Sequence, residues 1–180
     1  MDLFKKLNNY TGWSIFLIAS FVYLSTIEQT VSFWDCGEYI ATAYKLEVGH
    51  PPGAPFFQLL GRVFTLFATQ GTSEVAVAIN IMSALCSSFT ILFLFWTITA
   101  FASKIFPIKE GVLDQGKMIA ILGSGIVGAL SYTFSDSFWF SAVEGEVYAM
   151  SSLFTAVTFW CIMKWEKESE KPQASRWLVL

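Results

Sequence analysis

The stretch INIMSALCSSFTILFLFWTITAF, residues 79–101, contains no charged residue and decides the class of fold. A transmembrane helix needs about 20 consecutive, mostly apolar residues. Residues 75–102, which include this stretch and its flanks, meet that requirement. They therefore predict a helix that crosses a lipid bilayer.

The composition extends this prediction to the rest of the chain. Hydrophobic residues make up 54% of the sequence and charged residues 14%, whereas about a quarter of the residues in a soluble domain are charged. The net charge of −3 and the lack of a basic block exclude a nucleic-acid partner. Cys36, Cys86 and Cys161 have neither disulfide-framework nor zinc-ligand spacing. We predict an all-α integral membrane protein, a multi-span helical bundle.

Three further spans are predicted, over residues 13–30, 118–134 and 147–163, and a fifth begins near residue 177. We therefore interpret the chain as the N-terminal part of a larger membrane protein. The first span resembles a signal peptide, but no small-residue cleavage site follows its apolar core. An uncleaved membrane anchor is the better interpretation.

Basic residues decide the topology, because cytoplasmic loops of membrane proteins are enriched in Lys and Arg. With these spans, nine of the eleven basic residues lie on one side: Lys5, Lys6, Lys104, Lys109, Lys117, Lys164, Lys167, Lys171 and Arg176. If residues 54–69 were another span, the basic residues would be distributed over both sides of the membrane. We therefore predict that residues 54–69 form an interfacial helix. We expect the N-terminus to be cytoplasmic and the protein to lie in a bacterial inner membrane.

Two loops, residues 31–74 and 135–146, then face the external side and hold seven of the fourteen acidic residues. These are Asp35, Glu38, Glu47, Glu74, Asp136, Glu144 and Glu146. Carboxylates among aromatic residues at a membrane edge are costly to desolvate, so they are candidates for function.

Asp35 and Glu38 have both a structural and a functional interpretation. Asp followed three residues later by Glu resembles a capping box, here at the start of a helix over residues 36–46. One face of that helix would carry polar side chains and the other apolar ones: Asp35, Glu38, Thr42 and Lys45 against Ile40, Ala43 and Tyr44. Capping does not explain why the polar side chains continue along one face of the helix. We favour Asp35 as catalytic, and both roles stay open for Glu38.

The segment His50-Pro51-Pro52-Gly53-Ala54-Pro55 predicts a rigid corner, because proline restricts its neighbours and glycine permits a sharp turn. Pro52 or Pro55 would occupy the first turn of the next helix. A corner does not require histidine, however, and imidazole binds phosphate when protonated or a metal when neutral. His50, Lys45 and Arg62 are therefore candidates for binding a phosphate group.

Glu144, Glu146 and Tyr148 form the second candidate site, for an acceptor or a metal, although the two carboxylates would also suit a solvated loop. A carboxylate-rich site suits magnesium or manganese, and the sequence leaves open whether a cation joins Asp35 to Glu144 and Glu146. The GxGxxG pattern at residues 123–128 lies inside a predicted span without a βαβ unit. We interpret it as helix packing, not as a dinucleotide site.

The stretch WDCGEYIATAYKLEVGHPPGAPFF, residues 34–57, is similar to the signature of a membrane-protein family related to the protein O-mannosyltransferases. The predicted membrane topology, with interfacial helices in the first external loop, resembles that of the GT-C glycosyltransferases. This resemblance implies an extracytoplasmic enzyme that transfers a sugar from a polyprenyl-phosphate donor to a protein or glycan hydroxyl, with inversion. Asp35 matches the position of the catalytic carboxylate. Those enzymes usually have a paired acidic motif there, whereas in this sequence Cys36 follows Asp35 and the next acid is Glu38.

Two other functions would also place charges in a membrane protein. A transporter or flippase of a lipid-linked saccharide often has broken helices and polar groups at mid-bilayer. The charges here lie at the external edge instead, which favours the enzyme. A scaffold subunit with a merely solvated acidic loop is the third alternative.

Overall fold

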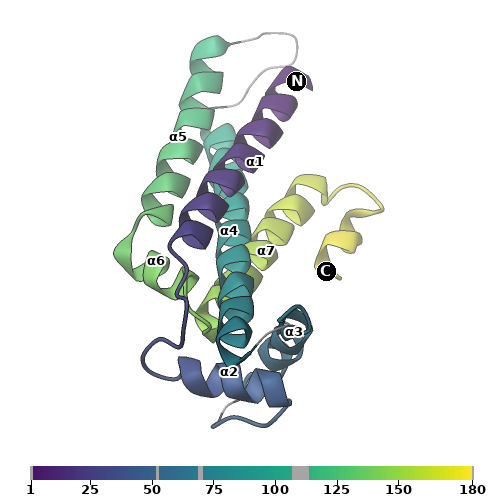
Figure 1. Ribbon diagram of the computed structural model, residues 1–180. Coiled ribbons are helices and arrows are strands. Elements are labelled where there is room, and N and C mark those ends of the chain that lie inside the picture. Colours follow the sequence, from purple (N-terminus) through teal and green to yellow (C-terminus); the bar gives the residue numbers. More distant parts are fainter. Residues whose placement is uncertain (1, 52, 69–70, 107–113, 180) are drawn as a thin grey trace. The chain divides into compact units, whose positions relative to one another are not determined.

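The computed structural model describes residues 2–51, 53–68, 71–106 and 114–179. Within these ranges the secondary structure is helical, without strands, which confirms the all-α fold (Figure 1). The elements are α1 (Asp2–Ser25), α2 (Cys36–Lys45), α3 (Pro55–Thr65), α4 (Thr72–Ile105), α5 (Gln115–Thr133), α6 (Asp136–Ala142), α7 (Val147–Glu168) and the 3-10 helix η1 (Ala174–Leu178). Pro52, Thr69 and Lys109, which enter the sequence predictions, lie outside the described ranges.

Three of these helices, α4, α5 and α7, are long and apolar enough to cross a membrane. The span predicted over residues 13–30 overlaps α1, which ends at Ser25 and is not one of the three. That span stays a prediction. The same holds for the fifth span, where the described residues form η1.

The chain forms two compact units, each described by itself. The first consists of Met1–Ala19, Phe89–Phe134 and Phe154–Leu180, and the second of Ser20–Ser88 and Ser135–Leu153. Helices α1, α4 and α7 contribute residues to both units. The acidic loops and all the candidate site residues belong to the second unit.

The first unit is packed through aromatic residues and small residues. The ring of Trp96 on α4 lies 6.2 Å from that of Trp13 and 5.9 Å from that of Trp160. On α5, a Cβ atom at Gly125 would lie 2.7 Å from Cε2 of the fully buried Phe95. The glycine pattern at residues 123–128 thus lies on a helix, and Gly125 permits close packing against α4.

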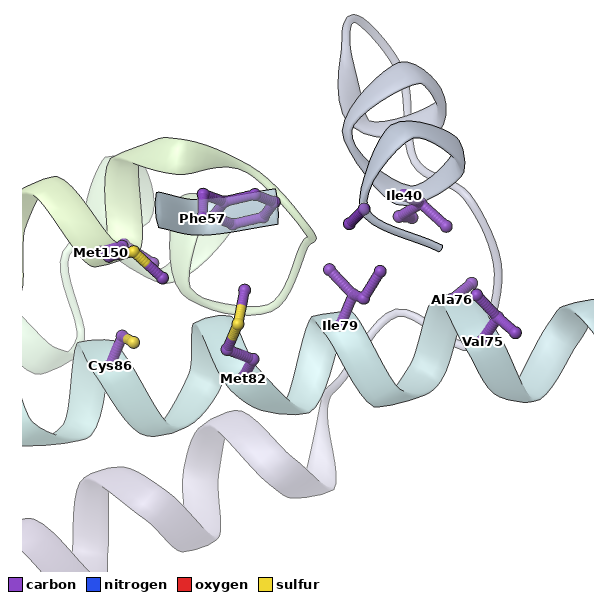
Figure 2. Close-up of a cluster of buried hydrophobic side chains, with 10 residues drawn as sticks. Ile40, Phe57, Val75, Ala76, Ile79, Met82, Cys86 and Met150 are labelled. Carbon is purple, nitrogen blue, oxygen red and sulfur yellow. The ribbon is translucent and has the colours of Figure 1, made fainter. Parts of the chain in front are cut away.

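In the second unit, α2 and α3 lie next to each other and pack on the N-terminal half of α4. Figure 2 shows Ile79 and Met82 pointing from α4 toward Ile40 of α2 and Phe57 of α3. Ile79 is fully buried in this apolar cluster. The cluster fixes the two short helices that carry the candidate site.

The corner between α2 and α3 positions His50. Helix α2 ends at Lys45 and is followed by the C-cap residue Leu46, whose φ of 55° is left-handed. Helix α3 begins at Pro55, one of the two predicted positions. The predicted faces of α2 are wrong in part, because Thr42 is buried and Tyr44 is exposed. In its buried position the Thr42 hydroxyl accepts a hydrogen bond from Gln58 Nε2 on α3, at 3.2 Å.

In the second unit, hydrogen bonds connect the segment between α1 and α2 to the second predicted external loop and to α4. The Glu28 N–H donates to the Val143 carbonyl at 3.1 Å. Asn80 Nδ2 on α4 donates to the carbonyls of Glu28, at 2.8 Å, and Thr30, at 3.1 Å. The second loop also contains α6, a short helix that the sequence analysis does not predict.

Gly145→Ala is expected to destabilise the second unit by about 1–3 kcal/mol, the usual cost of overpacking a core. The added Cβ would lie 2.9 Å from Asn80 Oδ1 and 3.0 Å from Ile79 Cγ2. Asn80 is held by its two hydrogen bonds and cannot move away cheaply. Gly123→Ala is the control, because no atom lies within 4 Å of its Cβ position. Chemical unfolding in detergent should show destabilisation only for Gly145→Ala, and equal stability of the two variants would contradict the packing.

Candidate functional site

Glu38 and His50 form the best-defined polar contact of the second unit. The backbone N–H of His50 donates to Glu38 Oε1 at 2.6 Å, and ring Nδ1 lies 2.8 Å from Oε2 of the same carboxylate. Gly49 permits this approach, since a Cβ atom there would lie 3.0 Å from Glu38 Oε1. Glu38 on α2 thereby fixes both the corner and the orientation of the imidazole.

Asp35 lies on the other side of the same imidazole, with Oδ2 3.8 Å from His50 Nε2. The capping-box prediction is wrong, because the Asp35 side chain makes no capping hydrogen bond and its backbone is already in the helical region (φ −83°, ψ −1°). An N-cap residue normally has an extended backbone. The carboxylate of Asp35 is instead 60% exposed and accessible to a ligand. The preceding Trp34 has a φ of 62° and is exposed, a backbone conformation uncommon outside glycine.

The ionisation of Glu38 and His50 is linked. The hydrogen bond and the charge of Glu38 raise the pKa of His50, and Asp35 adds to this effect. Hydrogen bonds from the backbone and ring of His50 lower the pKa of Glu38. The ion pair is therefore intact below the raised pKa of His50 and above the lowered pKa of Glu38. The ion pair is lost when the pH rises through the pKa of His50, because the imidazole loses its charge. It is also lost when the pH falls through the pKa of Glu38, because the carboxylate becomes protonated.

The imidazole of His50 is expected to titrate above its ordinary pKa of 6.5. Because His50 is the only histidine in the chain, its ring signals can be followed directly by NMR after histidine labelling. Glu38→Gln should lower the measured pKa, since the carboxylate charge is removed. Glu47→Gln, the same change at an exposed residue that pairs with Lys45, should leave it unchanged. Equal pKa values in wild type and Glu38→Gln would contradict the pairing.

A second, buried group brings the two acidic loops together. The Cys36 thiol donates to Glu146 Oε1 at 3.4 Å. Glu144 and Glu146 are only 4% and 6% exposed, so the solvated-loop alternative is wrong for both. Burial chiefly raises the pKa of Glu144, and the charge of Glu146 adds to it, against a hydrogen bond from Ser32. Burial and these two carboxylates also raise the pKa of Cys36.

Tyr39 is a site residue that the sequence analysis missed. Its ring centre lies 6.1 Å from that of His50 and 5.6 Å from that of Phe57. Burial raises the pKa of the Tyr39 hydroxyl, and the charges of Asp35 and Glu146 add to this effect. The charges of both acidic groups, the one that contains Asp35 and the one that contains Glu146, therefore act on Tyr39. Tyr39 follows Asp35 by four residues, a spacing that places two side chains on the same face of a helix. This spacing is the pattern by which the sequence indicates Tyr39.

The remaining candidate residues, Lys45, Arg62 and Tyr148, are described by other contacts or by their exposure. Lys45 Nζ is 4.0 Å from Glu47, and the Arg62 guanidinium lies over the Tyr44 ring at 5.2 Å. Among the described residues, no ion pair joins Lys45 or Arg62 to Asp35 or Glu38. Tyr148, at the start of α7, is 60% exposed.

Within the part of the chain that the structure describes, two sets of side chains have the spacing of metal ligands: Asp35 with Glu38 and His50, and Cys36 with Glu144 and Glu146. In each set the ligand atoms lie within 4.8 Å of one another. Asp35 thus falls into a different set from Glu144 and Glu146. The first set includes an imidazole and the second a thiol, whereas magnesium prefers oxygen ligands. Neither set is an all-oxygen magnesium site.

Comparison with known proteins identifies the family. Residues 35–180, from the first site carboxylate to the end of the chain, match the family described as the protein O-mannosyl-transferase TMEM260 N-terminal domain. The chain belongs to this family. The predicted relation to the protein O-mannosyltransferases is confirmed.

Two curated relatives carry the same family name. Protein O-mannosyl-transferase tmem260 of Dictyostelium discoideum is 29% identical over 143 residues, which cover 79% of this chain and 15% of the relative. Protein O-mannosyl-transferase TMEM260 of Mus musculus is 24% identical over 164 residues, 91% of this chain and 20% of the relative. The chain thus spans a fifth or less of the length of these relatives. No solved structure matches it.

Proposed function

We propose that this chain is the N-terminal part of a GT-C-type protein O-mannosyltransferase whose active site contains Asp35. The arrangement of Asp35, His50 and Glu38 is the observation that carries the proposal. It lies at the start of the family match and joins a 60% exposed carboxylate to an oriented imidazole. The sugar would come from a polyprenyl-phosphate donor. The site would face the extracytoplasmic side of a bacterial inner membrane.

In the proposed reaction, the Asp35 carboxylate removes the proton from an acceptor hydroxyl on a protein or glycan. The acceptor oxygen attacks the anomeric carbon of the sugar as the bond from that carbon to the phosphate oxygen breaks. The bonding electrons leave with the polyprenyl phosphate, and the configuration at the anomeric carbon inverts. A positioned general base typically accelerates such a step about 10²–10⁴-fold.

His50 would act on the phosphate of the donor and on the orientation of Asp35. Its Nδ1 is occupied by Glu38, so only Nε2 remains for a further contact. Glu38 is then a positioning residue, because both of its oxygens already contact His50. Lys45 and Arg62 stay candidates for neutralising the phosphate, and Glu144, Glu146 and Tyr148 for the acceptor side.

Incubating the full-length protein with radiolabelled polyprenyl-phosphate mannose and acceptor peptides would test this proposal. We expect label on a Ser or Thr hydroxyl, in the anomeric configuration opposite to that of the donor. Transfer from a nucleotide sugar alone, or retention of the donor configuration, would contradict it. Movement of the lipid-linked sugar across the bilayer without any transfer would favour the flippase instead.

A further inference from the structure

The first unit contains a cavity that the proposed reaction does not use. Residues of α1, α4 and α7 enclose a volume of about 610 Å³, within the usual range for small-molecule pockets. Four of its lining residues are lysines: Lys5, Lys104, Lys164 and Lys167. Since three separate helices supply these lysines, the fold concentrates the positive charge at one place.

The acidic residues nearby do not neutralise this charge. Glu166 is the only acid in the lining, so the four lysines leave a net charge of +3. Glu166 pairs with Lys104. Glu168, outside the lining, is held by Arg176 and Trp177, each at 3.0 Å. Lys5, Lys164 and Lys167 therefore leave the cavity positively charged and suited to an anion.

The rest of the lining combines aromatic and apolar residues with a few uncharged polar ones, namely Asn8, Asn9, Thr99 and Ser103. The Trp96 and Trp160 rings form part of the wall, and Lys164 Nζ lies over the Trp160 ring at 4.9 Å. Asn8 also lines the cavity, and its buried Oδ1 has no hydrogen-bond partner. A ligand that combined a negative charge, a hydroxyl donor and an apolar portion would satisfy all three features.

We propose that this cavity binds the phosphate of an anionic glycerophospholipid, with a head-group hydroxyl near Asn8 and an acyl chain along the tryptophans. The lysines belong to the set that the positive-inside rule assigns to the cytoplasmic side. Basic pockets between transmembrane helices on that side are suited to anionic head groups. The lipid would be structural, and its binding does not depend on the proposed sugar transfer.

Native mass spectrometry of the full-length protein with phosphatidylglycerol or phosphatidylcholine tests the proposal. Wild type should retain phosphatidylglycerol in preference to the zwitterionic lipid. Each lysine near an anionic lipid contributes about 1 kcal/mol, or roughly fivefold in affinity. Lys5→Gln combined with Lys164→Gln should therefore weaken phosphatidylglycerol binding by roughly 25-fold. Lys5→Arg combined with Lys164→Arg should preserve it.

Lys117→Gln is the matched control, because it removes the same charge from the first unit at a lysine outside the cavity, paired with Asp114 at 3.7 Å. It should change binding less than twofold. Equal retention of the two lipids by wild type, or equal losses in the Lys117 and Lys5/Lys164 variants, would overturn the proposal. Displacement of the lipid by millimolar inorganic phosphate would also overturn it, since the site would then serve a soluble anion.

Discussion

Asp35→Asn in the full-length protein is expected to lower sugar transfer by about two to four orders of magnitude while leaving the fold intact. The amide cannot accept the proton of the acceptor hydroxyl. Helix α2 should not be affected, because the Asp35 side chain makes no capping hydrogen bond in the wild-type chain. Initial rates at saturating donor, measured on equal amounts of purified protein, check this expectation.

The control for this variant is Asp136→Asn. Asp136 is another exposed carboxylate of the second unit and lies in the first turn of α6. The same isosteric change there should leave transfer within about threefold of wild type. An Asp35→Asn enzyme that was equally active would mean that the carboxylate takes no part in proton transfer, and the assignment of the base would be wrong.

The second large effect is an all-or-none difference in labelling across the membrane. A membrane-impermeant thiol reagent applied from outside should modify Glu47→Cys, and it should not reach Lys171→Cys until the membrane is opened. Both positions are exposed. The three native cysteines are buried, which keeps the background low. Labelling of both positions from one side of the membrane would contradict the predicted topology and the extracytoplasmic site.

Local patterns in the sequence predict short helices close to α2 and α3, but they do not predict α6. Two short helices occur in the first acidic loop, over Cys36–Lys45 and Pro55–Thr65, where helices over residues 36–46 and 54–69 are predicted. Their boundaries follow from Gly, Pro and the polar spacing near the corner, which act over a few residues. That these helices lie at the membrane interface stays a prediction.

The contacts of the site depend on residues far apart in the chain and were not predictable in the same way. Glu144 and Glu146 are buried because their loop packs against Cys36, which lies 110 residues before Glu146. No local pattern distinguishes such carboxylates from solvated ones. The pairing of Glu38 with His50 likewise depends on the turn between α2 and α3, which brings residues 12 positions apart within 2.8 Å.

The Asp35 capping prediction failed for a related reason. A capping box is a pattern of residue types, whereas a cap also requires an extended backbone at the first residue. Asp35 is already helical, and the exposed Trp34 before it takes the left-handed conformation instead. The backbone therefore turns one residue earlier than the pattern predicts, and the Asp35 carboxylate is left beside His50.

Photocrosslinking of a polyprenyl-phosphate sugar analogue to the full-length protein tests the placement of the active site most directly. The photoreactive group would be carried on the sugar, and the modified peptides would be identified by mass spectrometry. We predict adducts within residues 31–62, the segment that contains Asp35, Glu38 and His50, and their loss when unmodified donor is added in excess. Competable adducts confined to other parts of the protein, with none in residues 31–62, would contradict the proposed site.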